Sequence, residues 1–392
     1  MTEPAMIGIV AEWNPFHKGH EKMIREIRMN YPHSSIVAVM SGSFVQRGEP
    51  ALFDKWSRAV WACRHGVDAV FELPVLSVLQ SADRFAEAGT KLLASMGCNA
   101  IAFSTESLGQ KQLEEAVSFS QTAEYHACFK TSLKAGHSYA QASSISMASH
   151  SVPLSKELTK PNNLLGYRYL ETIQSYGLDM KIIVCHRDIE HNISASLIRK
   201  NILQNQDVSG LPDREADEVI NLLKEGNYTD YIRYQDACHL LSRLYSLEEL
   251  SASGLFKEGL ENKWFRESER NNYLEMLDSI KSKRYLYSRL KRIGACLLLT
   301  NEFPSSFVAG NYPLYARLLA LKQENSPMLR RIKKTGIPVI TSAARALKNL
   351  PSPVAKQLEM DISASNIRSC FAHSEKYRQG KEDFYHSPVI VS

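Results

Sequence analysis

The sequence of 392 residues lacks the features of several protein classes. Its seven cysteines lie far apart and never form a CxxC pair, which argues against a zinc knuckle and a disulfide framework and predicts reduced, mostly structural thiols. No apolar run is long enough to span a bilayer. The first residues, Met1 to Ala5, lack the basic region of a secretory signal. Internal repeats, coiled-coil heptads and low-complexity segments are also missing, so we expect a globular cytoplasmic protein without a membrane partner.

The length exceeds the roughly 100–200 residues that one domain usually holds, which predicts two domains. The composition, 44% hydrophobic and 23% charged, is that of an ordinary globular chain. We place the boundary at Asn205 to Asp213, giving domains 1–205 and 206–392. Charge is uneven beyond it: residues 201–280 hold 8 Lys/Arg against 16 Asp/Glu, and residues 281–350 hold 14 against 2. The second of these segments would attract a polyanion.

The first half alternates short β-branched runs with helical patterns, which predicts an α/β fold with a doubly wound parallel sheet. The strand candidates are Met6–Ala11, Ser35–Met40, Ala69–Glu72, Ala100–Ser104 and Met180–Cys185. The helix candidates are His20–Asn30, Asp54–His65, Ser81–Met96, Leu164–Tyr176 and Ser194–Leu203. Beyond about residue 205 the strand-like runs thin out, and we expect a mainly helical C-terminal domain. Ligands should bind where the carboxyl ends of the strands meet.

The apolar run Ile7 to Ala11 breaks at Asn14-Pro15 and is followed by two histidines around a glycine, in the order His17-Lys18-Gly19-His20. A buried strand that ends in a turn before a helix presents backbone N–H groups to an anion. His17 and His20 would add donors for phosphoryl oxygens. This order predicts a nucleotide-phosphate site and an adenylyl-transfer enzyme that uses ATP.

The loop after the second strand contains Gln46 and Arg47, both placed to reach a ligand. Arg47 is either a phosphate clamp or a solvated surface arginine, and the residues leave this open. Glu72 ends the third strand, where a ligand or metal contact is geometrically possible. On the intervening helix, Lys55 and Arg58 either serve the site or lie on a solvated face, and we expect Trp56 in the core.

Two helix starts carry further polar groups. Ser194, Ser196 and Arg199 open a helix after the last strand, where they are either donors to a phosphate or an ordinary serine cap with an exposed arginine. Asn162 and Asn163 open another helix, and because capping explains only one of them, the other remains available to an adenine or ribose edge. The pattern of residues 193–199 recurs at residues 362–368, which we interpret as coincidence or an interface element.

Taken together, WNPFHKGH, MSGSFVQRGEPA, KWSRA, GVDAVFELP, KPNNLLGYRY and ISASLIR resemble the bacterial tRNA(Met) cytidine acetate ligase family of the class I nucleotidyltransferase-like superfamily. The resemblance is dense over residues 6–203 and looser beyond. It implies a Rossmann-like nucleotidyltransferase fold, formation of acetyl-adenylate from acetate and ATP, and acetylation of N4 of the wobble cytidine in elongator tRNA(Met), with AMP and pyrophosphate as products. Mg²⁺ is expected to accompany the ATP phosphates.

The resemblance also implies which residues act. His17, His20 and Arg199 would be catalytic, stabilising charge on the phosphates. The ATP contacts would be Val10, Ala11, Glu12, Trp13, Asn14, Pro15, Phe16, His17, Lys18, Gly19, His20, Glu21, Lys22, Met23, Ser104, Asn163 and Arg187, together with Asn162, Ser194, Ser196 and Arg199 from the helix starts. Possible substrate contacts are Gln46, Arg47 and Glu72. No protein metal ligand is predicted.

The basic segment fits a tRNA partner, because Lys and Arg interleaved with Tyr285 and Tyr287 combine phosphate attraction with stacking surfaces. The predicted tRNA-binding residues are Lys281, Lys283, Arg284, Arg289, Lys291, Arg292, Arg330, Arg331, Lys333 and Lys334. Two other functions remain open on residues alone. One is a nucleotidyltransferase that adenylylates a small phosphorylated cofactor precursor, and the other is a nucleotide-sensing RNA-binding protein without turnover.

Overall fold

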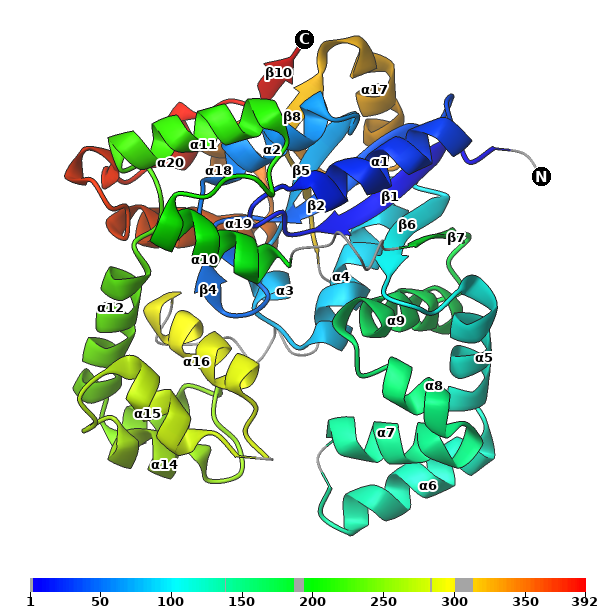
Figure 1. Ribbon diagram of the computed structural model, residues 1–392. Helices are drawn as coiled ribbons and strands as arrows, with labels where there is room; N and C mark the ends of the chain where they lie inside the picture. The colour runs from blue at the N-terminus through cyan, green and yellow to red at the C-terminus, as the bar shows by residue number, and fades with distance from the viewer. Residues whose placement is uncertain (1–2, 138, 187–193, 283, 300–312) are drawn as a thin grey trace.

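The fold is built on one large, mostly parallel sheet with helices on both faces (Figure 1). The computed structural model describes residues 3–137, 139–186, 194–282, 284–299 and 313–392. Within these residues the sheet has eight strands in the order β10-β8-β5-β2-β1-β6-β7, with β9 beside β8. Their bounds are β1 Met6–Ala11, β2 Ser35–Ser41, β5 Ala69–Leu73, β6 Ala100–Thr105, β7 Lys181–His186, β8 Ala316–Lys322, β9 Val339–Ile340 and β10 Val389–Val391. A two-stranded hairpin, β3 (Phe44–Val45) with β4 (Glu49–Pro50), follows β2.

The strand order reverses at β1. From β1 the chain moves outward through β2 to β5, and then it returns to the other side of β1 with β6 and β7. All these neighbours pair in parallel. In open α/β sheets, ligands bind in the crevice outside the strand ends at such a switch point. The segment that follows β1 therefore begins where a ligand is expected.

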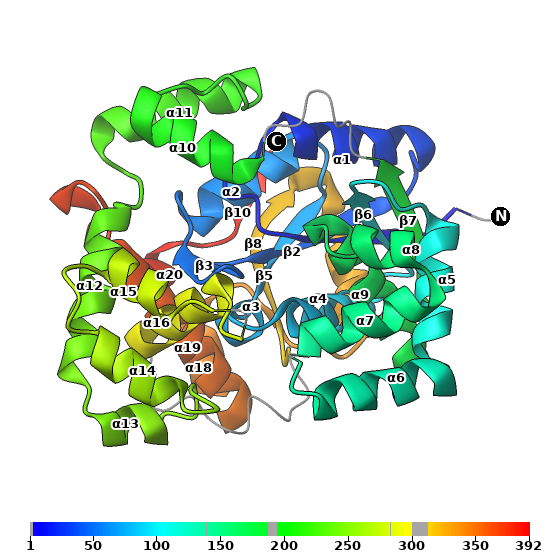
Figure 2. The ribbon, with the colours of Figure 1, turned by 60° about the horizontal axis from the view of Figure 1, so that its bottom comes forward.

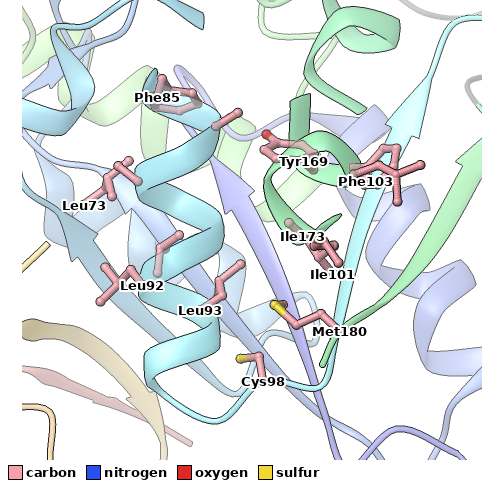
Figure 3. Close-up of a cluster of buried hydrophobic side chains, with 14 of the residues drawn as sticks. Leu73, Phe85, Leu92, Leu93, Cys98, Ile101, Phe103, Tyr169, Ile173 and Met180 are labelled. Atoms are coloured by element: carbon pink, nitrogen blue, oxygen red, sulfur yellow. The ribbon is translucent and has the colours of Figure 1, made fainter. Parts of the chain in front are cut away.

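Alternating residues of the strands pack into two cores, one on each face of the sheet. On one face β1 contributes Met6 and β2 contributes Val37 and Val39. On the other face, Ile7 of β1 and Ile36 of β2 pack into the second core. Figure 3 shows the first core, where side chains of α4 and α9 meet those of β6. Since both faces are covered, the strands read as continuous apolar runs.

Helices α4 and α9 lie on the first face with α5 and α17, and α1, α2, α10 and α11 lie on the other. The helices are α1 Lys18–Asn30, α2 Lys55–Arg64, α3 Val75–Val78, α4 Ala82–Ser95, α5 Gln110–Ser120, α6 Ala123–Lys134, α7 Tyr139–His150, α8 Val152–Glu157, α9 Pro161–Ser175, α10 Ala195–Asn205, α11 Asp213–Glu225, α12 Tyr231–Leu244, α13 Leu247–Ala252, α14 Leu260–Glu267, α15 Tyr273–Ile280, α16 Tyr287–Leu299, α17 Ser326–Lys334, α18 Ala343–Asn349, α19 Ser352–Cys370 and α20 Glu382–Tyr385. Helices α5–α8 and α12–α16 lie on opposite sides of the molecule (Figures 1 and 2).

The five strands and five helices predicted from the sequence are confirmed, with ends shifted by at most three residues. The α/β class is confirmed as well. The part beyond residue 205 is mainly helical, and α12–α16 pack around a third core, to which β3, α3 and α19 also contribute. However, it also supplies β8, β9 and β10 to the sheet, with β8 antiparallel to β5. The boundary at residues 205–213 stays a prediction, because the sheet draws strands from both sides of it.

None of the helices within the described residues is long and apolar enough to cross a bilayer.

Candidate active site

The segment between β1 and α1 turns sharply at the end of the central strand. Ala11 ends β1, and Trp13 then adopts a left-handed conformation with φ of 44°. Non-glycine residues seldom take this conformation, and it recurs at functional sites. Here it redirects the chain so that Asn14, Phe16 and His17 follow as buried residues before the helix begins. The turn therefore brings the start of α1 to the switch point of the sheet.

Both predicted histidines cap this helix with one ring nitrogen. His17 is the N-cap residue, and its Nδ1 accepts the N–H of Gly19 at 3.1 Å. His20 Nδ1 accepts the N–H of His17 at 3.3 Å, and the two rings stack with centroids 3.6 Å apart. A ring nitrogen that accepts a hydrogen bond carries no proton, so in each ring the proton lies on Nε2. Each histidine is thereby held as a neutral Nε2–H donor at the positive end of a helix.

A layer of aromatic and charged side chains supports these rings from behind. The ring of Phe16 lies 5.7 Å from that of His20 and stacks at 5.2 Å on the ring of His65, the C-cap of α2. His65 in turn contacts Glu215 of α11 at 2.7 Å and Glu21 of α1 at 3.5 Å. Three helices thus fix the orientation of the segment that carries the histidines.

The start of α10 reaches the same turn. Arg199 donates from Nη1 to the carbonyl oxygen of Asn14 at 2.7 Å and from Nη2 to Ser196 Oγ at 3.4 Å. Ser194 is the N-cap of α10 and accepts the N–H of Leu197. The structure therefore brings Arg199 to the histidine segment, while Ser194 makes an ordinary helix cap. Ser194 and Ser196 are both exposed.

A carboxylate, Glu12, lies at the end of β1 among several arginines. Its Oε1 accepts the backbone N–H of Gln46 at 2.5 Å and a bond from Ser41 Oγ at 3.4 Å. Desolvation raises the pKa of Glu12, although the charges of Arg199, Arg47 and Arg58 act in the opposite direction. The Gln46 side chain is turned to the carbonyl of Gln80, and Arg47 is exposed. The two loop residues predicted to reach a ligand thus adjoin the end of β1.

Lys55 and Arg58 do not lie on a solvated face, which was one of the two interpretations that the sequence allowed. Arg58 is fully buried and donates to the carbonyl oxygens of Glu12 at 2.7 Å and Ser41 at 3.1 Å, and also to that of Gly42. Burial lowers its pKa to about 10. The helical period of the segment could not reveal this, because the carbonyls that Arg58 satisfies belong to strand ends distant in sequence. Trp56 is buried, as predicted.

Glu72 lies in a buried ion network rather than at an open surface. Its carboxylate receives Lys55 Nζ at 2.8 and 2.9 Å and Arg317 Nη1 at 3.2 Å, and both cations also pair with Asp383. Gly42 permits this approach, since a Cβ there would lie 2.0 Å from Glu72 Oε1. As a substrate contact Glu72 stays a prediction, but the structure gives its carboxylate a structural task.

Both asparagines of α9 are engaged with the loop after β6. Asn163 is fully buried, and its Oδ1 accepts the N–H groups of Glu106, Ser107 and Leu108 at 3.0–3.4 Å. Asn162 Nδ2 donates to Glu106 Oε1 at 2.9 Å. Neither asparagine caps α9, whose N-cap is Lys160, so the expectation that capping occupies one of the two amides is wrong. Their role in ATP binding stays a prediction, which Asn163 could serve by shaping the loop.

The remaining predicted ATP contacts surround the same switch point. Ser104, near the end of β6, lies 3.7 Å from the sulfur of Met23 on α1. Lys18 is exposed and donates from Nζ to the carbonyl of Ser209 at 3.0 Å. Val10 packs against α4, where Gly89 leaves room for it. Arg187 and Lys283 lie outside the described residues. Ala11 and Pro15 are buried, Gly19 and Glu21 half-buried, and Lys22 is exposed.

The predicted tRNA-binding residues separate into two groups. The first, in residues 281–292, adjoins the hairpin after β2: Lys291 pairs with Glu49 of β4, and a Cβ on Gly48 would lie 2.4 Å from the Arg292 nitrogen. The second group, Arg330 to Lys334 on α17, lies beside Met6 and Ser35, at the amino ends of β1 and β2. The two groups thus occupy opposite ends of the sheet (Figure 1).

Comparison with known proteins gives concordant matches over nearly the whole chain. The sequence model of the HIGH Nucleotidyl Transferase family matches residues 5–383. A tRNA(Met) cytidine acetate ligase of Clostridium botulinum (strain Loch Maree) is 30% identical over 418 residues, covering 98% of each chain, and one of Fervidobacterium nodosum is 29% identical over 421 residues, covering 98% of this chain and 99% of the relative. The structure of Thermotoga maritima TmcAL bound with alpha-thio ATP superposes with a TM-score of 0.92 at 27% identity, covering 98% of this chain and 99% of that one.

Proposed function

The chain belongs to the HIGH nucleotidyl transferases and, within them, to the tRNA(Met) cytidine acetate ligases, and on that premise we propose that it acetylates N4 of the wobble cytidine of elongator tRNA(Met). The reaction would consume ATP and acetate and release AMP and pyrophosphate. One observation carries the assignment to this site: two neutral Nε2–H donors, His17 and His20, stand at a helix start where the strand order reverses. Such a position is suited to bind phosphate.

In the first step an acetate oxygen attacks the α-phosphorus of ATP, and the bond to the β-phosphate oxygen breaks. Negative charge grows on the α-phosphate and on the departing pyrophosphate. His17 and His20 would donate from Nε2 to those oxygens without carrying charge of their own, and Arg199 would hold the pyrophosphate. Because both rings are fixed by capping bonds before the substrate arrives, little reorganisation is needed at the moment of reaction.

Mg²⁺ would enter with ATP as part of the substrate. The described residues contain no group of three or more His, Cys, Asp or Glu that could hold a metal ion. Mg²⁺ that accompanies a nucleotide is usually bound by phosphate oxygens, water and one or two carboxylates.

The test is a reconstitution with ATP, Mg²⁺, acetate and unmodified elongator tRNA(Met), followed by digestion of the RNA and mass spectrometry. We expect N4-acetylcytidine and AMP, each dependent on both ATP and acetate. AMP or pyrophosphate without modified RNA would move the acceptor elsewhere and favour transfer to a small cofactor precursor. Complete lack of ATP turnover would favour a nucleotide-sensing RNA-binding protein.

His20→Ala tests the catalytic assignment within this assay. We expect adenylate formation, followed as acetate-dependent exchange of pyrophosphate into ATP, to fall by about 10²–10⁴-fold, since a positioned donor to developing charge is lost. Binding of tRNA should persist. His33→Ala, which removes an exposed histidine beside the amino end of β2, serves as the matched control and should keep the full rate. Retained exchange in His20→Ala would contradict the assignment.

We further propose that the two basic groups contribute unequally to tRNA binding. The group at residues 281–292 lies on the side of the sheet where the histidines are, and Arg284 and Arg289 there flank the ring of Tyr285 at about 6 Å. Replacing Arg284 and Arg289 with alanine should weaken tRNA binding. It should also reduce the slope of log K against log salt concentration by the equivalent of roughly one to two phosphate contacts. The matched pair Arg330→Ala with Arg331→Ala should have the smaller effect. Equal effects would refute the unequal division.

A further inference from the structure

The carboxylate of Glu12, one of the predicted ATP contacts, has no chemical role in the proposed first step. Along β1, Met6 packs into the core beneath α4 and α9, and Val10 packs against the same core. Since side chains alternate along a strand, Glu12 projects toward that same side, just beyond the last residue of β1. Burial raises the pKa of Tyr169 on α9, and the charge of Glu12 adds to this effect. The two groups are therefore close enough to interact electrostatically. Glu12 therefore stands at the switch point, on the face of the sheet opposite to α1.

The two oxygens of the Glu12 carboxylate differ in their hydrogen bonds. Oε1 is held by the Gln46 N–H at 2.5 Å and by Ser41 Oγ at 3.4 Å. Oε2 accepts no hydrogen bond from any residue that the structure describes. Because it is not one of the fully buried atoms without a partner, part of its surface is accessible. The side chain as a whole is half-buried. One oxygen is thus anchored, and the other faces the accessible side of the site.

The second step of the proposed reaction needs a group of this kind. The exocyclic N4 of cytosine is a weak nucleophile, because its lone pair is delocalised into the ring. When N4 attacks the acetyl carbonyl, the nitrogen gains positive character and must lose a proton. A positioned base that accepts this proton typically accelerates such a step by about 10²–10⁴-fold. His17 and His20 are held as Nε2–H donors, so neither ring is set up to accept it.

We propose that Glu12 is the general base of the acetyl-transfer step. The N4–C bond to the acetyl carbon forms, one N4 proton passes to Glu12 Oε2, and the C–O bond to the adenylate phosphate breaks, which releases AMP with the electron pair. Glu12 then returns the proton to solvent. This role rests on the proposed function, and it concerns the second step only.

The surroundings of Glu12 suit proton transfer. Burial raises its pKa and outweighs the hydrogen bond from the Gln46 N–H and the positive charges of Arg199 on α10, Arg47 on the hairpin loop and Arg58 on α2. Burial and, second to it, the charge of Glu12 raise the pKa of Tyr169 on α9. A carboxylate whose pKa lies above the ordinary range accepts a proton more readily, so the transfer step should show an acid limb set by Glu12.

The experiment separates the two steps in the full-length enzyme. Glu12→Gln keeps the shape and an oxygen for the Gln46 N–H, but it cannot act as a base. Because Glu12 is also a predicted ATP contact, its loss should raise the KM for ATP, and acetate-dependent exchange of pyrophosphate into ATP is therefore measured at saturating ATP, where we expect it to fall by no more than about tenfold. Single-turnover transfer of the acetyl group to tRNA should fall much further, by about 10²–10⁴-fold, and the acid limb of its pH profile should disappear. The exchange that remains also demonstrates that the variant is folded.

A matched control is Glu49→Gln, which removes the hairpin carboxylate that lies 3.9 Å from Arg199. This variant should transfer acetate within about fivefold of wild type and keep the acid limb. If Glu12→Gln loses exchange and transfer alike, Glu12 acts in adenylation or ATP binding and the proposal is refuted. If Glu12→Gln transfers normally, the AMP phosphate or water takes the proton, and the proposal is equally refuted. A wild-type enzyme that forms adenylate but no acetylcytidine would instead overturn the proposed function.

Discussion

The pattern Ile-Ser-Ala-Ser-x-Ile-Arg occurs twice in the chain, at residues 193–199 and at residues 362–368, and the two copies lie in different parts of a helix. In the first copy Ser194 caps α10, so the polar residues stand at a helix start. The second copy lies in the C-terminal half of the long helix α19, beyond its first turn. Backbone N–H groups are available to a ligand only in the first turn of a helix. Only the first copy can therefore present them to an anion.

The side chains of the two copies differ in the same way. Ser196 is exposed, whereas its counterpart Ser365 is buried and bonds Ser43 Oγ at 3.0 Å. Arg368 is also buried and donates to the carbonyl oxygens of Ala51 at 3.2 Å and Leu52 at 3.3 Å. The second copy is thus an interface element between α19 and the loop region after β2, one of the two interpretations offered from the sequence.

The two arginines nevertheless act on neighbouring segments. Arg199 binds the carbonyl of Asn14, and Arg368 binds that of Leu52, while the Leu52 N–H donates to Asn14 Oδ1 at 2.8 Å. Arg199 approaches the contact between Asn14 and Leu52 from the ligand side, and Arg368 approaches it from the interior. The comparison teaches that equal residue patterns acquire different tasks when their surroundings differ in solvent access. Each prediction below can break or sharpen that distinction.

The largest expected effect is on catalysis at the first copy. Arg199→Ala should lower acetate-dependent exchange of pyrophosphate into ATP by about 10³-fold, because a cation that stabilises developing phosphate charge is removed. The free energy of unfolding should fall by only about 1 kcal/mol, the usual worth of one hydrogen bond. Exchange kinetics and urea unfolding measure the two quantities. A variant that unfolds easily but still catalyses exchange would reverse the distinction.

The second copy should show the opposite balance. Arg368→Ala removes a buried cation that bonds two carbonyls and helps to hold the pKa of Asp54 below its ordinary value, against the effect of burial. We expect the free energy of unfolding to fall by about 2–4 kcal/mol. At a temperature where the variant remains folded, its exchange rate should stay within about fivefold of wild type. Urea unfolding monitored by tryptophan fluorescence tests this, and a stability equal to that of wild type would contradict it.

The smallest effect concerns Asp361, the residue before the second copy. Its Oδ1 accepts the Val75 N–H at 2.7 Å, and its Oδ2 accepts the Tyr315 hydroxyl. Desolvation, with the charge of Glu72, raises its pKa from 3.8 to about 7. The folded state therefore holds the proton more tightly than the unfolded chain does. Its contribution to stability is full below about pH 4 and is lost as pH rises toward 7.

Asp361→Asn cannot ionise, so the free energy of unfolding of the variant minus that of wild type should increase between pH 4 and pH 7, by at least about 1 kcal/mol. Above pH 7 the difference should level off. Urea unfolding of both proteins at several pH values measures it. Parallel stability curves across this range would show that Asp361 does not titrate as its burial implies.

Prediction from the sequence succeeded where the information is local. Strands such as Met6–Ala11 and helices such as α4 follow from the period of apolar residues, and the expected bounds agree within a few residues. The histidines could also be placed at a helix start, since the strand, the break at Asn14-Pro15 and the helix are consecutive. Strand β8 was missed, because its partner β5 lies far earlier in the chain and its flanks are helical. Strands β9 and β10 were missed because they are only two and three residues long and pair with β8.

The same difference between local and long-range information applies to the residues of the site. Local order brought His17, His20 and Arg199 into consideration, and the structure adds how they are held. Burial of Lys55, Arg58 and Glu72 could not be foreseen, because a charged side chain is normally solvated and the partners that permit burial, such as Arg317 and Asp383, come from the far end of the chain.

The sequence by itself determined the elements of the α/β core, the order of the histidine segment and the family to which the chain belongs. The tertiary structure decided which of the two similar patterns faces a ligand, which of the two basic groups lies at the same end of the sheet as the histidines, and which oxygen of Glu12 is left accessible. The physical reason is that periodicity and turn chemistry act between near neighbours, whereas solvent access and charge pairing depend on segments that only the folded chain brings together.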